Sequence, residues 1–453
     1  MHPKKVYIET HGCQMNVDDS LRMEKSLASL SYQATLRPED ADLILINTCS
    51  IREKASHKAH SAVGRYYPLK SLKPSMILGL TGCQAQMEGQ KILQRFHYLD
   101  FVLGPDQLAS LPQLIQKIES GKERQLNQTA RIKPSEFEFV ELALAGQETM
   151  RSAFVTIMKG CDNFCSFCVV PFVRGREVSR PSGEIIEEIK RLIDHGVKEV
   201  TLLGQNVNSY GSKGSAELSF PELLRKIAKE SSIERIRFTT SHPKDVKQDL
   251  IDAFRDLPQL CKHLHLPVQA GSNKVLQKMY RTYTREEYLS IVEGLRNACP
   301  DIAITTDLIV GFPGESDEDF EQTLSLMDEV RFDAAFSFCY SPRPHTTAAR
   351  YFLEDVPSQT KENRLRLLQE KQRRFTFQKN EGCVGKNYNV LVEGASKWGE
   401  SLQARTTHNR VVHLNSMDET LVGKVLKVKI MQASPTALKG EILSSDEGDV
   451  WGM

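Results

Sequence analysis

The chain has 453 residues, of which 40% are hydrophobic and 26% are charged. These values exclude a fibrous or wholly disordered chain, and the length predicts about three domains. Lys and Arg number 59 against 58 Asp and Glu, so a nucleic-acid partner would have to be held by local basic patches.

Targeting and membrane signals are missing from the sequence. The amino-terminal segment MHPKKVYIET lacks the apolar core of a signal peptide, and no segment approaches the ~20 apolar residues of a membrane span. We therefore expect a cytoplasmic protein without a membrane partner. In such a chain ten cysteines favour metal ligands or redox groups over a disulfide framework.

Three apolar runs in the first part of the chain each end at a cysteine. VYIETHGC, DLILINTC and MILGLTGC end at Cys13, Cys49 and Cys83. Each spacing suits one strand and one crossover helix, which predicts an open parallel α/β sheet over residues 4–120. Ligands bind such sheets at the carboxyl ends of the strands, so we expect the three thiols to converge on one site. The alternative is three buried structural cysteines.

A second domain is predicted over residues 147–378, after a polar linker at 121–146. Six apolar runs alternate with helix-like segments there, which predicts six βα units and a full or partial parallel barrel. The runs are AFVTIMKG, VKEVTLLGQN, IERIRFTTSH, HLHLPVQAG, IAITTDLIVGF and DAAFSFCYSP. Residues 361–379 are predicted to form one helix with seven Lys and Arg against two Glu.

The last domain is predicted over residues 380–444. Short, β-branched, alternating runs with glycine turns favour a small antiparallel β-barrel there. Its basic residues form a candidate surface for nucleic acid: Lys386, Lys397, Arg405, Arg410, Lys424, Lys427, Lys429 and Lys439. The alternative is an ordinary solvated face.

The strongest chemical signal is the CxxxCxxC of GCDNFCSFC, just past the first predicted barrel strand. The thiolates of Cys161, Cys165 and Cys168 can hold three irons of a four-iron cluster. Residues 169–190 offer no further Cys or His, so one iron would be left open for a substrate or cofactor. The alternatives are a zinc loop that borrows His263 or His265, and a ferredoxin-like electron-transfer site.

This loop resembles that of the radical S-adenosylmethionine (SAM) superfamily. The blocks ETHGCQMN, NTCSIREKA, TGCQAQ and GCDNFCSFCVVPFVRGREVSR resemble, over nearly the whole chain, its methylthiotransferase family, and most of all the MiaB-type branch that acts on tRNA. The resemblance implies a methylthio group added to C2 of N6-isopentenyladenosine at position 37, beside the anticodon. It also implies two SAM molecules per turnover and two [4Fe-4S] clusters, with Cys13, Cys49 and Cys83 holding the second, auxiliary cluster.

The resemblance also bears on the fold, on SAM binding and on partners. It implies a (β/α)6-type radical SAM core and an OB-like TRAM barrel that binds the tRNA anticodon stem-loop. Strand ends similar to the superfamily's SAM-holding segments supply the SAM candidates Gln205, Asn206, Gln269, Ser272, Asp307 and Gly311, each of which could instead be a turn or cap. No catalytic residue beyond the cluster ligands is expected. Other expected partners are a reductant such as flavodoxin or ferredoxin and sulfur or iron–sulfur donors, and we expect a monomer.

Three places depart from the family pattern. His345 stands where Gly often precedes the Thr, Ala270 where Ser is frequent after PVQ, and Phe172-Val173 where Tyr-Thr is frequent. His345 is interpreted as a surface-loop residue, with a base or cofactor contact as the alternative. Three functions remain open: the tRNA activity above, the same chemistry on threonylcarbamoyl-adenosine or a ribosomal-protein aspartate, and a non-catalytic iron–sulfur RNA-binding redox sensor. Mass spectrometry of tRNA nucleosides separates the enzymatic targets, whereas the sensor would bind tRNA without producing deoxyadenosine.

Overall fold

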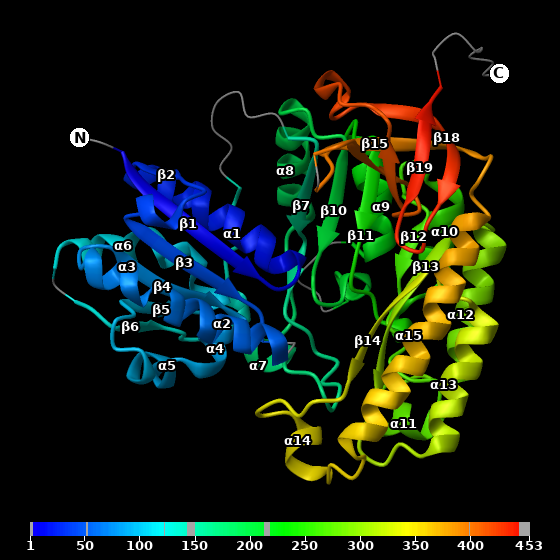
Figure 1. The fold of residues 1–453 in the computed structure, drawn as a ribbon, viewed down its shortest axis with the longest axis horizontal. Coiled ribbons are helices and arrows are strands. Elements are labelled where there is room, and N and C mark those ends of the chain that lie inside the picture. The colour runs from blue at the N-terminus through cyan, green and yellow to red at the C-terminus, as the bar shows by residue number, and fades with distance from the viewer. Residues whose placement is uncertain are drawn as a thin grey trace.

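The chain folds into three bodies that follow one another along the sequence (Figure 1). The computed structural model describes residues 3–50, 53–121, 123–142, 150–212, 218–397 and 399–443, without the side chains of residues 53–57. In Figure 1 the N-terminal body is blue to cyan, the central body is green to yellow, and the C-terminal body is orange to red.

The N-terminal body is a parallel sheet with the strand order β2-β1-β3-β4-β5-β6. Its strands are β1 (Lys4–His11), β2 (Tyr32–Ala34), β3 (Leu43–Thr48), β4 (Ile77–Gly82), β5 (Phe101–Leu103) and β6 (Leu126–Gln128). Its helices are α1 (Gln14–Leu27), α2 (Glu53–Arg65), α3 (Tyr67–Leu72), α4 (Cys83–Glu88), α5 (Gln90–Arg95) and α6 (Leu111–Glu119). The predicted open parallel α/β sheet is confirmed.

Burial of both sheet faces explains why the central strands read as continuous apolar runs. Every residue of β3 and β4 is buried. Ile44 and Ile46 belong to one hydrophobic cluster, whereas Leu43 and Leu45 belong to another, so the alternating side chains of β3 serve the two faces. The sheet also extends past residue 120, because β6 lies within the predicted linker and pairs with β5.

The central body contains the six expected parallel strands. They are β7 (Ser152–Thr156), β10 (Glu199–Leu203), β11 (Arg235–Phe238), β12 (His263–His265), β13 (Ala303–Val310) and β14 (Ala334–Cys339). They form two sheets, β11-β10-β7 and β12-β13-β14, which a parallel bridge between Ile236 and Leu260 connects. Within the described residues no ladder joins β7 to β14, so the barrel is partial. The sequence predicted a full or a partial barrel, and the structure has the partial form.

Helices cover the outside of this partial barrel, and the 24-residue α15 confirms the predicted basic helix (Figure 1). The helices are α7 (Val170–Val173), α8 (Ser182–Asp194), α9 (Phe220–Glu230), α10 (Gln248–Asp256), α11 (Asn273–Lys278), α12 (Arg285–Ala298), α13 (Asp317–Val330), α14 (Thr347–Tyr351) and α15 (Ser358–Glu381), and a short ribbon pairs β8 (Met158–Lys159) with β9 (Val178–Ser179). Among the described helices, none has both the length and the apolar character needed to cross a bilayer.

The C-terminal body is a closed barrel with the order β15-β16-β17-β19-β18. Its strands are β15 (Asn387–Ala395), β16 (Leu402–Thr406), β17 (Val411–Leu414), β18 (Val425–Ala433) and β19 (Leu438–Ile442). The expectation of an antiparallel barrel needs one correction, because β17 and β19 pair in parallel. A closed ring with an odd number of strands cannot alternate direction at every pair, so a five-stranded barrel must contain a parallel pair.

This small barrel docks on the end of the central barrel where the parallel strands begin. The Arg235 guanidinium, at the start of β11, donates to the carbonyl of Arg405 at 3.0 Å. His408 lies 3.1 Å from the Asp301 carboxylate, two residues before β13, and Arg410 pairs with Asp333, one residue before β14. The carboxyl ends of the same strands, which the cysteine loop follows, therefore lie at the opposite end.

Candidate functional site

The first three cysteines follow three adjacent strands at one edge of the N-terminal sheet. Parallel register pairs His11 with Thr48 and Thr48 with Gly82, so β1, β3 and β4 end at the same level. Cys49 and Cys83 come directly after their strands, and the Cys49 amide donates to the carbonyl of His11 at 2.9 Å. The expected convergence of the three thiols is thus what the register produces.

Close packing at Gly12 brings the first two of these cysteines together. A Cβ at Gly12 would lie 2.6 Å from the Cβ of Cys49. Cys13, the N-cap of α1, is exposed, and its thiol lies 3.3 Å from the side-chain oxygen of Asn16. Asn16 in turn donates to Asn47 at 3.0 Å in a buried amide network. The loop from β1 into α1 is therefore held against β3.

Mutual contact gives the three thiols different proton affinities. Hydrogen bonding to the Cys49 thiol lowers the pKa of Cys13 to about 6 and that of Cys83 to about 7. The same hydrogen bonds raise the pKa of Cys49 well above its usual value. Thiolates are the form in which cysteine binds metal, so the lowered pKa values favour ligation by Cys13 and Cys83.

A buried guanidinium from the central body reaches this trio. The Nε of Arg174 donates to the Cys83 sulfur at 3.3 Å, and its Nη2 donates to the Asp19 carboxylate at 2.6 Å. Its charge favours the Cys83 thiolate, and the negative charge of Asp19, then of Cys83 and Cys13, raises the pKa of Arg174 despite its burial. Three sulfur donors beside a fixed cation fit a ligand that carries negative charge, such as an iron–sulfur cluster bound by thiolates.

The second three cysteines lie in the loop that follows β8, with Cys161 and Cys165 each 8% exposed and Cys168 half-buried. The Cys161 amide donates to the Gly175 carbonyl at 3.2 Å, and the Cys168 amide donates to that of Cys165 at 2.9 Å. Burial raises the pKa values of Cys161 and Cys168, the former to about 11. The buried Arg281 donates to the Cys165 sulfur at 3.4 Å. Each cysteine group thus has one buried arginine.

The two groups meet across a thin apolar layer. Val169, directly after Cys168, and Val173 pack with Cys83 in one hydrophobic cluster. Helix α7, which carries Val173, contacts α4, which begins at Cys83. The segment from Cys168 to Arg174 therefore runs from one cysteine group to the other.

Two of the predicted SAM residues lie where β10 ends. The side-chain oxygen of Gln205 accepts a hydrogen bond from the Gly160 amide, which ties this strand end to the start of the cysteine loop. Asn206 is buried, and its amide donates to Asp245 at 2.8 Å, but its side-chain oxygen has no partner in the described structure. A buried orphan acceptor fits a ligand that brings a donor.

The other four predicted SAM residues lie on the β12–β13 side of the barrel. Gln269 is buried in a left-handed conformation, at φ 73°, and Asp307 on β13 lies 3.5 Å from the His265 ring. Ser272 accepts from the Val275 amide as the N-cap of α11, and Gly311 makes the turn where Lys361 packs. These last two have visible structural roles, and SAM binding by any of the four stays a prediction.

Sequence reasoning missed several residues of this site. Arg174 and Arg281 are single arginines, and only tertiary contact reveals their thiol partners. Ser241 and His242 follow β11, and each has a buried side-chain atom without a partner in the described structure. Burial lowers the pKa of His242 to about 2, so its ring is neutral. The polar end of the run IRFTTSH was the available signal.

The described residues contain no cluster of three or more His, Cys, Asp or Glu side chains arranged around a single metal ion. This finding leaves a four-iron cluster open, because each cysteine binds a different iron of a larger body. The histidines considered as zinc ligands, His263 and His265, both lie within hydrogen-bond distance of Thr305.

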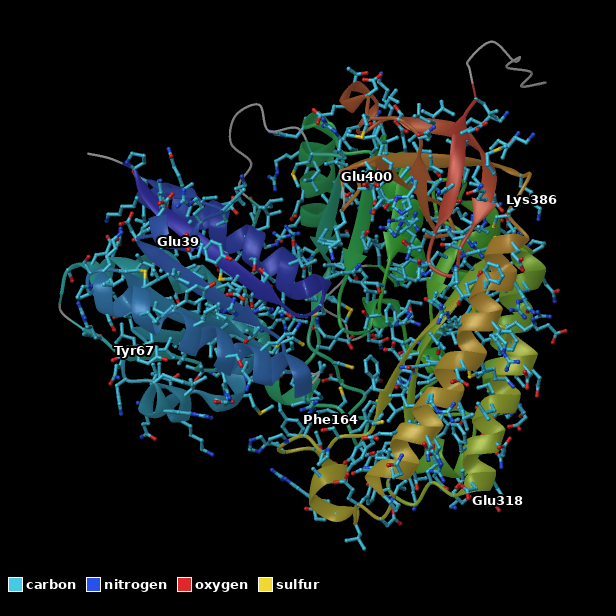
Figure 2. All side chains as sticks on the ribbon, in the orientation of Figure 1. Glu39, Tyr67, Phe164, Glu318, Lys386 and Glu400 are labelled. Carbon is cyan, nitrogen blue, oxygen red and sulfur yellow. The ribbon has the colours of Figure 1, made fainter. Side chains whose placement is uncertain are left out.

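Fewer basic residues are available to bind nucleic acid than the sequence predicted, because many of them form ion pairs within the protein. Five of the seven cations of α15 are in ion pairs, as are Arg405 and Arg410 in the small barrel. In the small barrel, the exposed lysines without an ion pair in the described structure are Lys386, Lys424, Lys427, Lys429 and Lys439. Lys427 and Lys429 alternate with buried Val428 and Ile430 on β18, so the lysines face outward. These five are called the lysine face, and Figure 2 labels Lys386 on it.

Family models cover each of the three bodies. Residues 5–104 match the uncharacterised protein family UPF0004, residues 155–327 match the radical SAM superfamily, and residues 381–443 match the TRAM domain.

Curated relatives match nearly the whole chain. The tRNA-2-methylthio-N(6)-dimethylallyladenosine synthase of Geotalea uraniireducens is 48% identical over 97% of this chain and 99% of its own length. The protein of the same name from Geobacter metallireducens is 49% identical over 97% of this chain and 98% of its own length.

Solved structures share the fold at low sequence identity. The radical SAM methyltransferase TsrM from Kitasatospora setae aligns with a TM-score of 0.58 and 13% identity, over 76% of this chain and 77% of that chain. The cobalamin-dependent radical enzyme OxsB aligns with a TM-score of 0.51 and 12% identity, over 83% of this chain and 56% of that chain.

Proposed function

Because the chain belongs to the tRNA-2-methylthio-N(6)-dimethylallyladenosine synthase family, we propose that it adds a methylthio group to C2 of N6-dimethylallyladenosine at position 37, beside the tRNA anticodon. It is a radical SAM tRNA methylthiotransferase. The observation that carries the residue-level proposal is the packing of Val169 and Val173 against Cys83, which sets the two cysteine groups next to each other. A base placed there would face both groups.

Cys161, Cys165 and Cys168 would hold one four-iron cluster, and Cys13, Cys49 and Cys83 a second. When bound, the first cluster and SAM supply a carbon radical that removes the unactivated C2 hydrogen, and the second supplies sulfur. The orphan atoms of Asn206, Ser241 and His242 suit a polar ligand such as SAM. Gln269 and Asp307 would add SAM contacts, whereas Ser272 and Gly311 would shape the strand ends beside it.

The chain's own residues position these groups. Gln205 fixes the start of the cysteine loop through the Gly160 amide, and Arg281 holds Cys165. Arg174 neutralises charge at Cys83 and connects it to Asp19. Hydrogen bonds from a cation to a ligating sulfur raise the reduction potential of a cluster, so these arginines would tune the two sites as well as orient them.

RNA would be held in part by the lysine face of the TRAM barrel, which offers cations to phosphates. We further propose a monomer, domains at residues 4–120, 147–378 and 380–444 with β6 added to the first of them, and an electron donor such as flavodoxin or ferredoxin. Sulfur or iron–sulfur donors would restore the second cluster. The tRNA anticodon stem-loop is the proposed substrate.

The deciding experiment is an anaerobic count of iron and sulfide per chain. The wild type should hold about eight irons, and a Cys13→Ala, Cys49→Ala, Cys83→Ala variant about four. A Cys299→Ala, Cys339→Ala, Cys383→Ala variant removes three cysteines outside both groups and should keep about eight. Equal counts in the first variant and the wild type would exclude the second cluster. Mass spectrometry of tRNA nucleosides from cells lacking the gene identifies the modified base.

A further inference from the structure

The lysine face cannot hold the RNA loop at the reacting base. The TRAM barrel docks where the parallel strands begin, through contacts such as Arg235 with Arg405 and His408 with Asp301. The loop with Cys161, Cys165 and Cys168 comes after β7 and β8, at the opposite, carboxyl end of the parallel strands. If the proposed function holds, other residues close to the cysteines must therefore hold the loop that carries the target base.

Three ring-bearing residues have a left-handed backbone conformation in the described structure. They are Phe164 at φ 47°, Tyr280 at φ 57° and His345 at φ 70°. Such angles are outliers for the bulky Phe164 and Tyr280, whereas His adopts them more readily, and strained residues cluster at functional sites. All three side chains are exposed, Phe164 by 41% and Tyr280 by 49%. The backbone is thus strained where it presents a ring to solvent.

One buried residue ties the three ring-bearing segments together. Ser166, within the cysteine loop, donates from its amide to the Met279 carbonyl at 3.0 Å and from its hydroxyl to the Lys278 carbonyl at 2.7 Å. Its own carbonyl accepts from the Ala348 amide at 2.7 Å. The segments before Tyr280 and after His345 are therefore fixed against the cysteine loop that contains Phe164.

Two residues that depart from the family pattern contact each other at this place. The Phe172 ring, 40% exposed on α7, lies 6.1 Å from the His345 ring at an interplanar angle of 35°. The guanidinium of Arg176 lies over the Phe164 ring at 5.1 Å. Flat rings beside a cation suit stacked bases joined by phosphates. Figure 2 shows Phe164 between the N-terminal body and α14.

We propose that Phe164, Phe172, Tyr280 and His345 form an aromatic rim that stacks unpaired RNA bases next to the target base. The inference rests on the proposed function and adds the residues that hold the loop. Proteins read single-stranded loops by splaying bases onto aromatic side chains, because every base has a stacking face.

The test uses the full protein and a synthetic RNA hairpin whose loop carries the target adenosine and a flanking 2-aminopurine. Glycine suits a left-handed backbone, so His345→Gly, Tyr280→Gly and Phe164→Gly remove a ring without adding strain. Each variant should bind the hairpin about five- to tenfold more weakly than the wild type. The 2-aminopurine quenching seen with the wild type should weaken too, while the thermal midpoint stays equal or rises.

The matched control is Tyr67→Ala, because Tyr67 is 52% exposed and also paired with a ring, that of Tyr98 at 4.7 Å. Figure 2 shows Tyr67 far from Phe164, so this variant should bind like the wild type. Unchanged affinity and quenching in the glycine variants would overturn the rim while the function stands. The rim also fails if SAM affinity, rather than RNA affinity, falls. A wild type that binds no hairpin would instead refute the proposed function.

Discussion

Gly160 comes directly before Cys161, and a single added Cβ atom there would disturb the cysteine loop that is proposed to hold a cluster. Its φ of 76° lies in the left-handed region, and a Cβ there would overlap the carbonyl oxygen of Arg176. The same residue donates its amide to Gln205. Backbone rather than a flexible side chain is the obstacle, so the neighbouring segment could not move aside without moving the cysteine loop.

We expect Gly160→Ala to lower the free energy of unfolding by ~1–3 kcal/mol and to reduce the number of iron atoms bound per chain. Gly183→Ala is the matched control, because Gly183 lies in α8 with open space around it. That change should raise stability by ~0.5–1 kcal/mol, since alanine favours the helix. Chemical denaturation measures the free energy of unfolding of both variants. Equal values would contradict the prediction that a Cβ at Gly160 clashes with the Arg176 backbone.

At the scale of elements, most basic side chains of α15 form ion pairs within the protein. Arg364 is buried and pairs with the buried Glu315 carboxylate at 2.7 Å. Burial raises the pKa of Glu315, while the hydrogen bond from the Gly311 amide and the charge of Arg364 favour its ionised form. Arg373 and Arg374 lie on the exposed side of the helix, without an ion pair in the described structure. The net charge of a helix therefore does not measure its capacity to bind RNA.

Arg364→Ala should destabilise the protein by ~3–5 kcal/mol, because it removes the cation beside the buried Glu315 carboxylate and leaves it only the hydrogen bond from the Gly311 amide. Arg373→Ala with Arg374→Ala should change the free energy of unfolding by less than ~0.5 kcal/mol, as is usual at the surface. Urea unfolding measures both. A large loss of stability in the double variant, or none in Arg364→Ala, would refute this division of the helix.

At the scale of the whole molecule, the TRAM barrel and the loop with Cys161, Cys165 and Cys168 lie at opposite ends of the central strands. Arg410 and Asp333 fix the barrel at one end, and Cys161 follows β7 at the other. A substrate that contacts both must extend along the central body, which suits a stem-loop better than a lone nucleoside. Substitutions in the lysine face should therefore lower RNA affinity without changing how the target base is placed at the cysteines.

Replacing Lys427 and Lys429 by Gln should weaken RNA binding and reduce the slope of log affinity against log salt by about 1.5, because two phosphate contacts are lost. Quenching of the flanking 2-aminopurine at saturating protein should stay as in the wild type. Lys190→Gln with Lys198→Gln, two exposed lysines of the central body, is the control and should leave the slope unchanged. An unchanged slope in the first variant would show that the lysine face does not touch RNA.

The sequence by itself determined the order of the domains, the parallel sheet, the six barrel strands and the two cysteine groups. Local signals sufficed for these, since apolar runs mark buried strands and the spacing of Cys161, Cys165 and Cys168 is specific. Only the tertiary structure decided that Val169 packs on Cys83 and that Arg174 reaches its sulfur. It also placed the TRAM barrel at the far end and paired most cations of α15. Those outcomes depend on contacts between segments far apart in the chain, which no local pattern encodes.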